Sequence, residues 1–127
     1  MKTWSRHMHL ALLPALVVMD LGAVDAAETL PMIRQTLMNK VVQAPAATLE
    51  THVIRVQFPP GFKSAEHTHD GPGPRYVVSG RVRVEDSGQT KDFGPGDVFW
   101  ETGGPMTIAN IGGSDAEMVI FELAPAK

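Results

Sequence analysis

Cysteine is absent from this chain of 127 residues. Its absence excludes a disulfide framework, a thiolate zinc site, an iron–sulfur cluster and a cysteine nucleophile. Any metal chemistry must therefore use histidine and oxygen ligands.

Basic side chains are also scarce. The chain has 11 Lys and Arg against 14 Asp and Glu, which gives a net charge of −3. Because neutralising many phosphates requires a basic surface, we expect no nucleic-acid partner. The length fits one domain.

Long hydrophobic runs are missing except near the N-terminus. A short basic region precedes the apolar run Leu10–Val18, and Val24-Asp25-Ala26 follows with small or tolerated residues at a cleavage point. The run is about half of the roughly 20 residues that span a bilayer, which argues against the alternative of a membrane anchor. We therefore expect residues 1–26 to be a signal peptide. The mature chain would be periplasmic or secreted, without membrane association after cleavage.

The rest of the chain predicts short strands and no convincing helix. Residues 50–58 alternate, with His52, Ile54, Val56 and Phe58 expected to face the interior. Seven further strands are expected between Gly, Pro, Asp and Ser punctuation, at Ala65–His69, Arg75–Ser79, Arg81–Glu85, Gln89–Phe93, Val98–Glu101, Met106–Asn110 and Glu117–Leu123.

This pattern predicts a single all-β domain, an antiparallel sandwich or small barrel over residues 50–124. Residues 27–49 would form an N-terminal arm or edge strand. Within them Thr29–Met38 is ambiguous between an added edge strand and a helical turn.

Two histidines stand two positions apart, at His67 and His69. In a strand, alternate side chains project from the same face, so both imidazoles could share one metal ion. The alternative is a pair of exposed strand histidines without a ligand.

The run Gly61 to His69, GFKSAEHTH, followed by RYVVSG ending at Gly80, resembles the first motif of the cupin superfamily. The stretch from Asp92 to Asn110 resembles the second motif. The resemblance implies an antiparallel jelly-roll β-barrel with a metal or small molecule in its mouth. It also implies a wide range of activities, and many relatives are homodimers.

Two of the ligands that the resemblance implies are missing. The family's glutamate falls on Gly73, and its second-motif histidine falls on Thr107 or Met106, depending on the residue from which the motif is counted. Of the family's three-histidine, one-glutamate set, only His67 and His69 remain.

Other residues could complete the site. His52 lies on the inward face of its strand and is a candidate ligand or a core histidine bonded to backbone. Glu101 is a candidate catalytic base or extra ligand at the barrel mouth, or an exposed loop carboxylate. Asp70 is a weaker candidate because its neighbour His69 points to the opposite face.

Two functions remain open from the sequence. One is a small-molecule-binding cupin with a divalent transition metal (Zn, Fe, Mn, Ni or Cu) on His67 and His69, with or without enzymatic activity. The other is a metal-free, non-catalytic binding or accessory domain. The intact His pair favours the first, and Gly73 together with Met106 or Thr107 favours the second.

Overall fold

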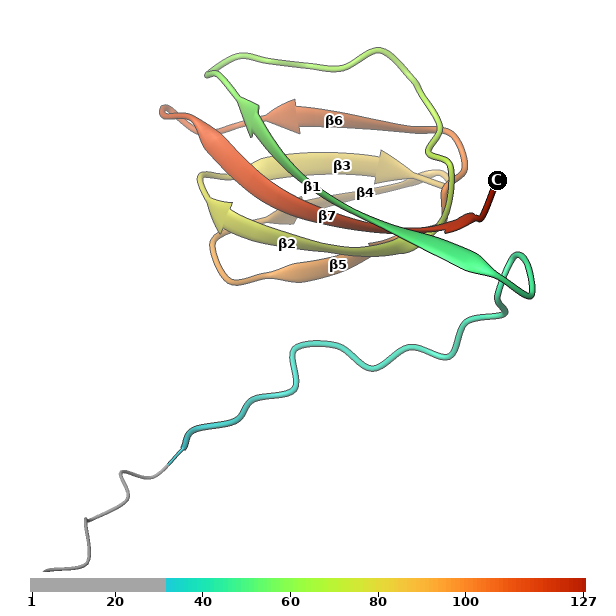
Figure 1. Cartoon of the computed structure of the whole chain (residues 1–127). Helices are drawn as coiled ribbons and strands as arrows, with labels where there is room; N and C mark the ends of the chain where they lie inside the picture. Colours follow the sequence, from blue (N-terminus) through green and yellow to red (C-terminus); the bar gives the residue numbers. More distant parts are fainter. Residues whose placement is uncertain (1–31) are drawn as a thin grey trace, which may run out of the picture. The chain divides into compact units, whose positions relative to one another are not determined.

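The computed structural model describes residues 32–127, and its compact unit Arg34–Lys127 contains seven strands (Figure 1). Their bounds are β1 Leu49–Phe58, β2 Gly73–Ser79, β3 Val82–Asp86, β4 Gln89–Phe93, β5 Val98–Glu101, β6 Met106–Asn110 and β7 Ala116–Pro125. The described residues contain no helix, and therefore none that could cross a membrane.

The strands form two antiparallel sheets, with strand orders β1-β7-β2-β5 and β4-β3-β6. Figure 1 shows the second sheet stacked on the first. Several neighbours in a sheet are distant in sequence, such as β1 beside β7, as expected of a jelly roll. The predicted all-β, antiparallel jelly-roll fold is confirmed.

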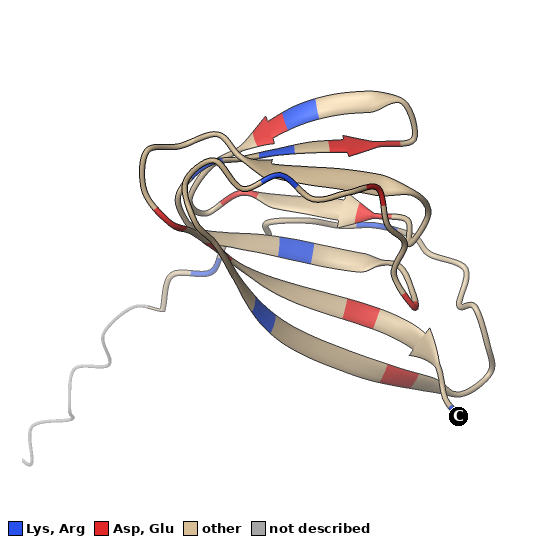
Figure 2. Ribbon diagram, turned by 90° about the horizontal axis from the view of Figure 1, so that it is seen from above, with Lys and Arg blue, Asp and Glu red and all other residues tan. Residues whose placement is uncertain are grey.

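The core lies between the facing sheets and follows the period of two within each strand. In β2 the buried residues are Gly73, Arg75 and Val77, and in β7 they include Met118, Ile120 and Glu122. The alternation that buries apolar side chains thus carries charged residues inward too. Charged residues lie within strands as well as in loops (Figure 2).

The expected strand at Ala65–His69 is wrong. This segment hydrogen-bonds beside β6 at uneven intervals: Ser64 N to Ile108 O, His67 N to Met106 O and His69 N to Gly103 O, at 2.8, 3.0 and 3.2 Å. Because the bonding residues are three and then two apart, no regular ladder forms. His67 makes only an isolated bridge with Met106.

The N-terminal expectations have mixed outcomes. Residues 32–38 form neither the edge strand nor the helical turn considered for Thr29–Met38, and 29–31 lie outside the described residues. The expected signal peptide also lies outside them. In β1, Ile54 pairs with the buried Ile120 and so lies on the core face, as expected, but it is 39% exposed because β1 is an edge strand.

The β3–β4 hairpin matches the turn expected at Asp86-Ser87-Gly88. Ser87 has φ 52° and Gly88 has φ 74°, the pair of positive angles that a two-residue type I′ turn requires. On the outward face, Arg83 donates to both oxygens of Asp92 at 2.7 and 2.8 Å. The guanidinium holds the pKa of the Asp92 carboxyl below its usual value, mainly through that hydrogen bonding.

Candidate functional site

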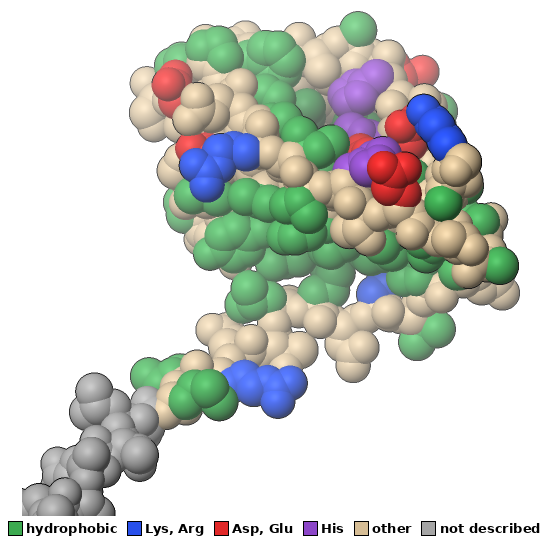
Figure 3. All heavy atoms as spheres, viewed as in Figure 1, with side chains coloured by type: hydrophobic (Ala, Val, Ile, Leu, Met, Phe, Trp, Pro, Cys, Tyr) green, Lys and Arg blue, Asp and Glu red, His purple; other side chains and the backbone are tan. Residues whose placement is uncertain are grey.

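The structure brings His67 and His69 together on the wall of a cavity. Their ring centroids are 5.0 Å apart and the planes meet at 67°. Both come from the extended segment that hydrogen-bonds beside β6, so backbone contacts and not a regular strand position them. Figure 3 shows histidine side chains gathered beside acidic side chains.

His67 presents a hydrogen-bond acceptor at this site. Its Nδ1 lies 2.9 Å from the carbonyl oxygen of Ala65, which can only accept, so Nδ1 carries the proton and donates. In the neutral ring Nε2 is then an acceptor. Among residues 32–127 nothing hydrogen-bonds to Nε2, so a ligand can use it.

His69 lies between two carboxylates from different strands. Its Nδ1 is 2.6 Å from Glu122 Oε1, and its Nε2 is 3.3 Å from Glu101 Oε2. Glu122 projects inward from β7, and Glu101 ends β5. Both carboxylates are buried, and together they fix the orientation of the ring.

Arg75, in β2, is completely buried and contacts both carboxylates. It donates from Nε to Glu101 Oε2 at 2.9 Å and from Nη1 to Phe121 O at 2.6 Å. Its Nη2 lies 2.8 Å from Glu101 Oε2 and 3.8 Å from Glu122 Oε1. Nη2 contacts Glu101 as an ion pair without a well-aligned hydrogen bond.

Sequence reasoning missed Arg75 and Glu122. The available signal was the strand period. Arg75 lies two positions before Val77, and Glu122 lies two positions after Ile120, so each shares the face of its strand that carries core residues. A charged residue on the apolar face of a strand indicates a buried ion pair or a site.

Glu101 is buried, not exposed in a loop, and lines a cavity of about 450 Å³. The cavity's polar end is formed by His67, His69 and Glu101, which lie beside one another, and Lys63 and Ser64 also line the cavity. Most of the remaining wall is apolar, formed chiefly by Val56, Phe58, Phe62, Met106, Ile108, Met118 and Ile120. Glu101 uses Oε2 for Arg75 and His69, and Oε1 has no hydrogen-bond partner among the described residues.

His52 does not line this cavity. It pairs opposite Glu122 across β1 and β7, with Nδ1 3.5 Å from Glu122 Oε2 and Nε2 3.5 Å from Glu50 Oε1. Its side chain is 31% exposed. Glu122 contacts both His52 and His69 and so links them. Asp70, the weaker candidate, is also not part of the cavity wall.

The two positions that lack the implied ligands now have structural explanations. Gly73 is the Cα partner of Glu101, and a Cβ built on it would overlap Phe121 O at 1.8 Å. Of the two positions considered for the second-motif histidine, Met106 lines the cavity, whereas the Thr107 hydroxyl donates to Glu85 at 3.2 Å. A thioether therefore stands at the cavity wall.

The donors present do not fit a resident divalent ion. Within residues 32–127, no three His, Asp or Glu side chains converge to hold a metal. Glu101 Oε2 is engaged by the Arg75 guanidinium, and both nitrogens of His69 face carboxylates. A cation bound between His69 and Glu101 Oε2 would have to displace these contacts.

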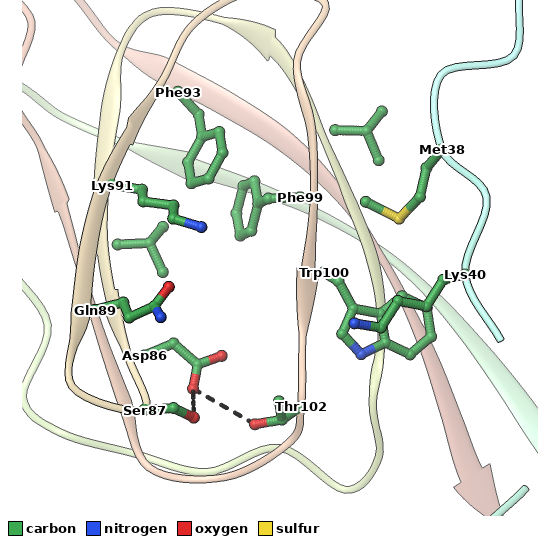
Figure 4. A pocket seen from close by; sticks show the side chains of 12 residues that line it. Met38, Lys40, Asp86, Ser87, Gln89, Lys91, Phe93, Phe99, Trp100 and Thr102 are labelled. Atoms are coloured by element: carbon green, nitrogen blue, oxygen red, sulfur yellow. Dashed lines mark hydrogen bonds between the residues drawn. The ribbon is translucent and has the colours of Figure 1, made fainter. Parts of the chain in front are cut away.

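A second cavity of about 450 Å³ shares no lining residue with the first (Figure 4). Lys40 Nζ lies 5.9 Å from the centre of the Trp100 ring, within cation–π range. Asp86 accepts from Ser87 at 2.7 Å and from Thr102 at 3.4 Å.

Residues 54–122 match the Cupin domain family, so the chain belongs to the cupins. A predicted oxalate decarboxylase from Thermotoga maritima is 28% identical, with TM-score 0.50 and coverage of 56% of this chain and 64% of that protein. KdgF from Halomonas sp. is 25% identical, with TM-score 0.53 and coverage of 65% and 76%.

A cupin superfamily protein from Desulfitobacterium hafniense is 18% identical, with TM-score 0.51 and coverage of 76% of this chain and 95% of that protein. At this identity the likeness shows the fold alone. No curated protein matches the chain. The family commonly binds metals, so the donor set described above is a departure within the family.

Proposed function

We propose that this cupin binds a small, mainly apolar molecule in the cavity and holds a hydrogen-bond donor of that molecule at the histidine end. The observation that carries the proposal is an apolar cavity that ends at His67, His69 and Glu101. Cavities of this size with a few convergent polar groups are typical ligand sites.

The polar end favours donors over anions. His67 Nε2 and Glu101 Oε1 are both acceptors without a partner among the described residues. An alcohol, phenol or amine can donate to them, whereas a carboxylate would lie against Glu101. A bound donor would also be placed against groups that can accept its proton, which is the role that Glu101 would have in an enzyme.

The competing function is a metal-dependent one, with a divalent transition metal on His67 and His69. Two adjacent imidazoles favour it, and the contacts of Glu101 with Arg75 disfavour it. In either case we propose that the protein acts in the periplasm or outside the cell, as the N-terminal sequence indicates.

The test uses three probes of similar size: benzyl alcohol, toluene and benzoate. Binding to the metal-stripped protein is measured by nuclear magnetic resonance shifts of the Met106 and Met118 methyl groups, both on the cavity wall. We expect benzyl alcohol to bind about 3- to 10-fold more tightly than toluene, the worth of one hydrogen bond. Benzoate should bind most weakly.

His67→Ala removes one of the two acceptors, so it should reduce the preference for benzyl alcohol and leave toluene binding unchanged. His52→Ala is the matched control, because His52 lies outside the cavity, and it should alter neither affinity. Absence of cavity shifts with every probe would overturn the proposal. Probe binding that appears only after addition of one equivalent of Zn²⁺ or Mn²⁺ would favour the metal-dependent function.

A further inference from the structure

Two buried carboxylates at this site require positive charge. Glu101 and Glu122 are 2% and 5% exposed, and a buried carboxylate without a partner is costly. Arg75 is the fully buried cation within reach of both, as the contacts at 2.8 and 3.8 Å indicate.

The guanidinium and a metal would compete for the same atom. Arg75 places Nε and Nη2 within 2.9 Å of Glu101 Oε2, and the same oxygen faces Nε2 of His69. Glu101 Oε2 is the carboxylate oxygen that faces His69, so an ion held between His69 Nε2 and this oxygen would need the atom that Arg75 already contacts. It would also lie close to a permanent positive charge.

Gly73 links this arrangement to the missing family ligand. A Cβ at position 73 would lie 1.8 Å from Phe121 O and 3.1 Å from Arg75 Nη1. Phe121 O is the acceptor that fixes Nη1 at 2.6 Å. The glycine that removes the implied glutamate is thus the residue that lets the backbone oxygen approach the guanidinium.

We infer that Arg75 is a built-in cation that takes the place of a divalent ion at this cupin site. The guanidinium neutralises Glu101 and Glu122 and orients Glu101 toward His69, so the polar end of the cavity is assembled by the chain itself. Arg75 is a positioning residue, because it does not line the cavity. This inference does not depend on which molecule the cavity binds.

The test removes the guanidinium and offers a metal in its place. Wild type, Arg75→Met and Arg83→Met are stripped of metal, and then titrated with Zn²⁺ and Mn²⁺ by calorimetry and thermal unfolding. Arg83→Met is the matched control, because it likewise removes an arginine that is ion-paired to a carboxylate, but on the outer surface.

We expect Arg75→Met to unfold at a lower temperature than the wild type and to bind Zn²⁺ at least 10-fold more tightly, with recovery of thermal stability. Freed from Arg75, Glu101 Oε2 becomes available to an ion beside His69. Adding His69→Ala should abolish the gain. Arg83→Met should show no gain in metal affinity.

A second variant tests the inference even if Arg75→Met does not fold. Arg75→Met with Glu122→Gln removes one charge of each sign and keeps Glu101 and His69, so it should fold and gain the same affinity for Zn²⁺. Folding of Arg75→Met only when Zn²⁺ is present would also support the inference. It is overturned if wild type binds one equivalent of Zn²⁺ through His67 and His69. It is also overturned if neither variant gains affinity or is refolded by Zn²⁺.

Discussion

At position 73 the chain has no room for a side chain. The backbone of β2 approaches Phe121 O so closely that even a methyl group would overlap it, at 1.8 Å from a built Cβ. Backbone atoms cannot rotate away as a flexible side chain could, so the strands would have to separate. Such separation would also disturb the hydrogen bond from Arg75 to Phe121.

We therefore predict that Gly73→Ala lowers the free energy of unfolding by about 3 kcal/mol or more, the upper range for overpacking a core. The measurement is urea unfolding followed by tryptophan fluorescence. Gly113→Ala is the matched control, since nothing lies within 4 Å of its Cβ, and it should change stability by less than about 0.5 kcal/mol. Equal effects of the two substitutions would contradict this account.

The sequence predicted part of the site because motif spacing identifies residues that one short segment positions. His67 and His69 could be found in this way. For Arg75 and Glu122 the strand period could indicate only an inward-facing charge. Their contacts depend on strand pairing over a long sequence separation, 46 residues at the Arg75–Phe121 hydrogen bond. Glu101 lies opposite Gly73 because of the register between β2 and β5, and the identities of the two residues do not predict that register.

At the scale of elements, turn residues and the alternation of apolar and polar side chains were sufficient to predict most strands. β4, β5 and β6 have the bounds that the sequence predicted. The failure at Ala65–His69 has a physical cause, since an extended segment becomes a strand only when its neighbour bonds to it at regular intervals. The sequence of a segment does not specify the spacing of its partner's carbonyl groups.

The β3–β4 hairpin provides a test of turn conformation without steric overlap. Gly88 has φ 74°, and nothing lies within 4 Å of a Cβ built on it. Gly88→Ala should therefore lower the free energy of unfolding by about 1 kcal/mol, which is the cost of placing a residue with a Cβ in the left-handed conformation. This loss corresponds to a decrease of roughly 5 °C in melting temperature. Differential scanning calorimetry measures this against Gly113→Ala. A loss as large as that of Gly73→Ala would mean that the hairpin is packed more tightly than this geometry indicates.

At the scale of the whole molecule, the two facing sheets account for both the core and the site. Their inward faces carry apolar side chains over most of the contact, with Arg75, Glu101 and Glu122 among them. The jelly roll could be predicted because strand length, turn spacing and family motifs agree. Homodimer formation stays a prediction, since a single chain does not test it.

Export is the remaining prediction at this scale. The first strand begins at Leu49 and the compact unit at Arg34, so cleavage after Ala26 would remove no strand of the described fold. We expect the intact mass of exported protein to correspond to residues 27–127. Leu13→Arg, which interrupts the apolar run, should leave an uncleaved product in the cytoplasm, because the h-region must stay apolar. Thr36→Arg adds the same charge outside the run and should be processed normally. A wild-type protein that retains residues 1–26 in the periplasm or medium, or that stays full-length in the cytoplasm, would refute the predicted signal peptide.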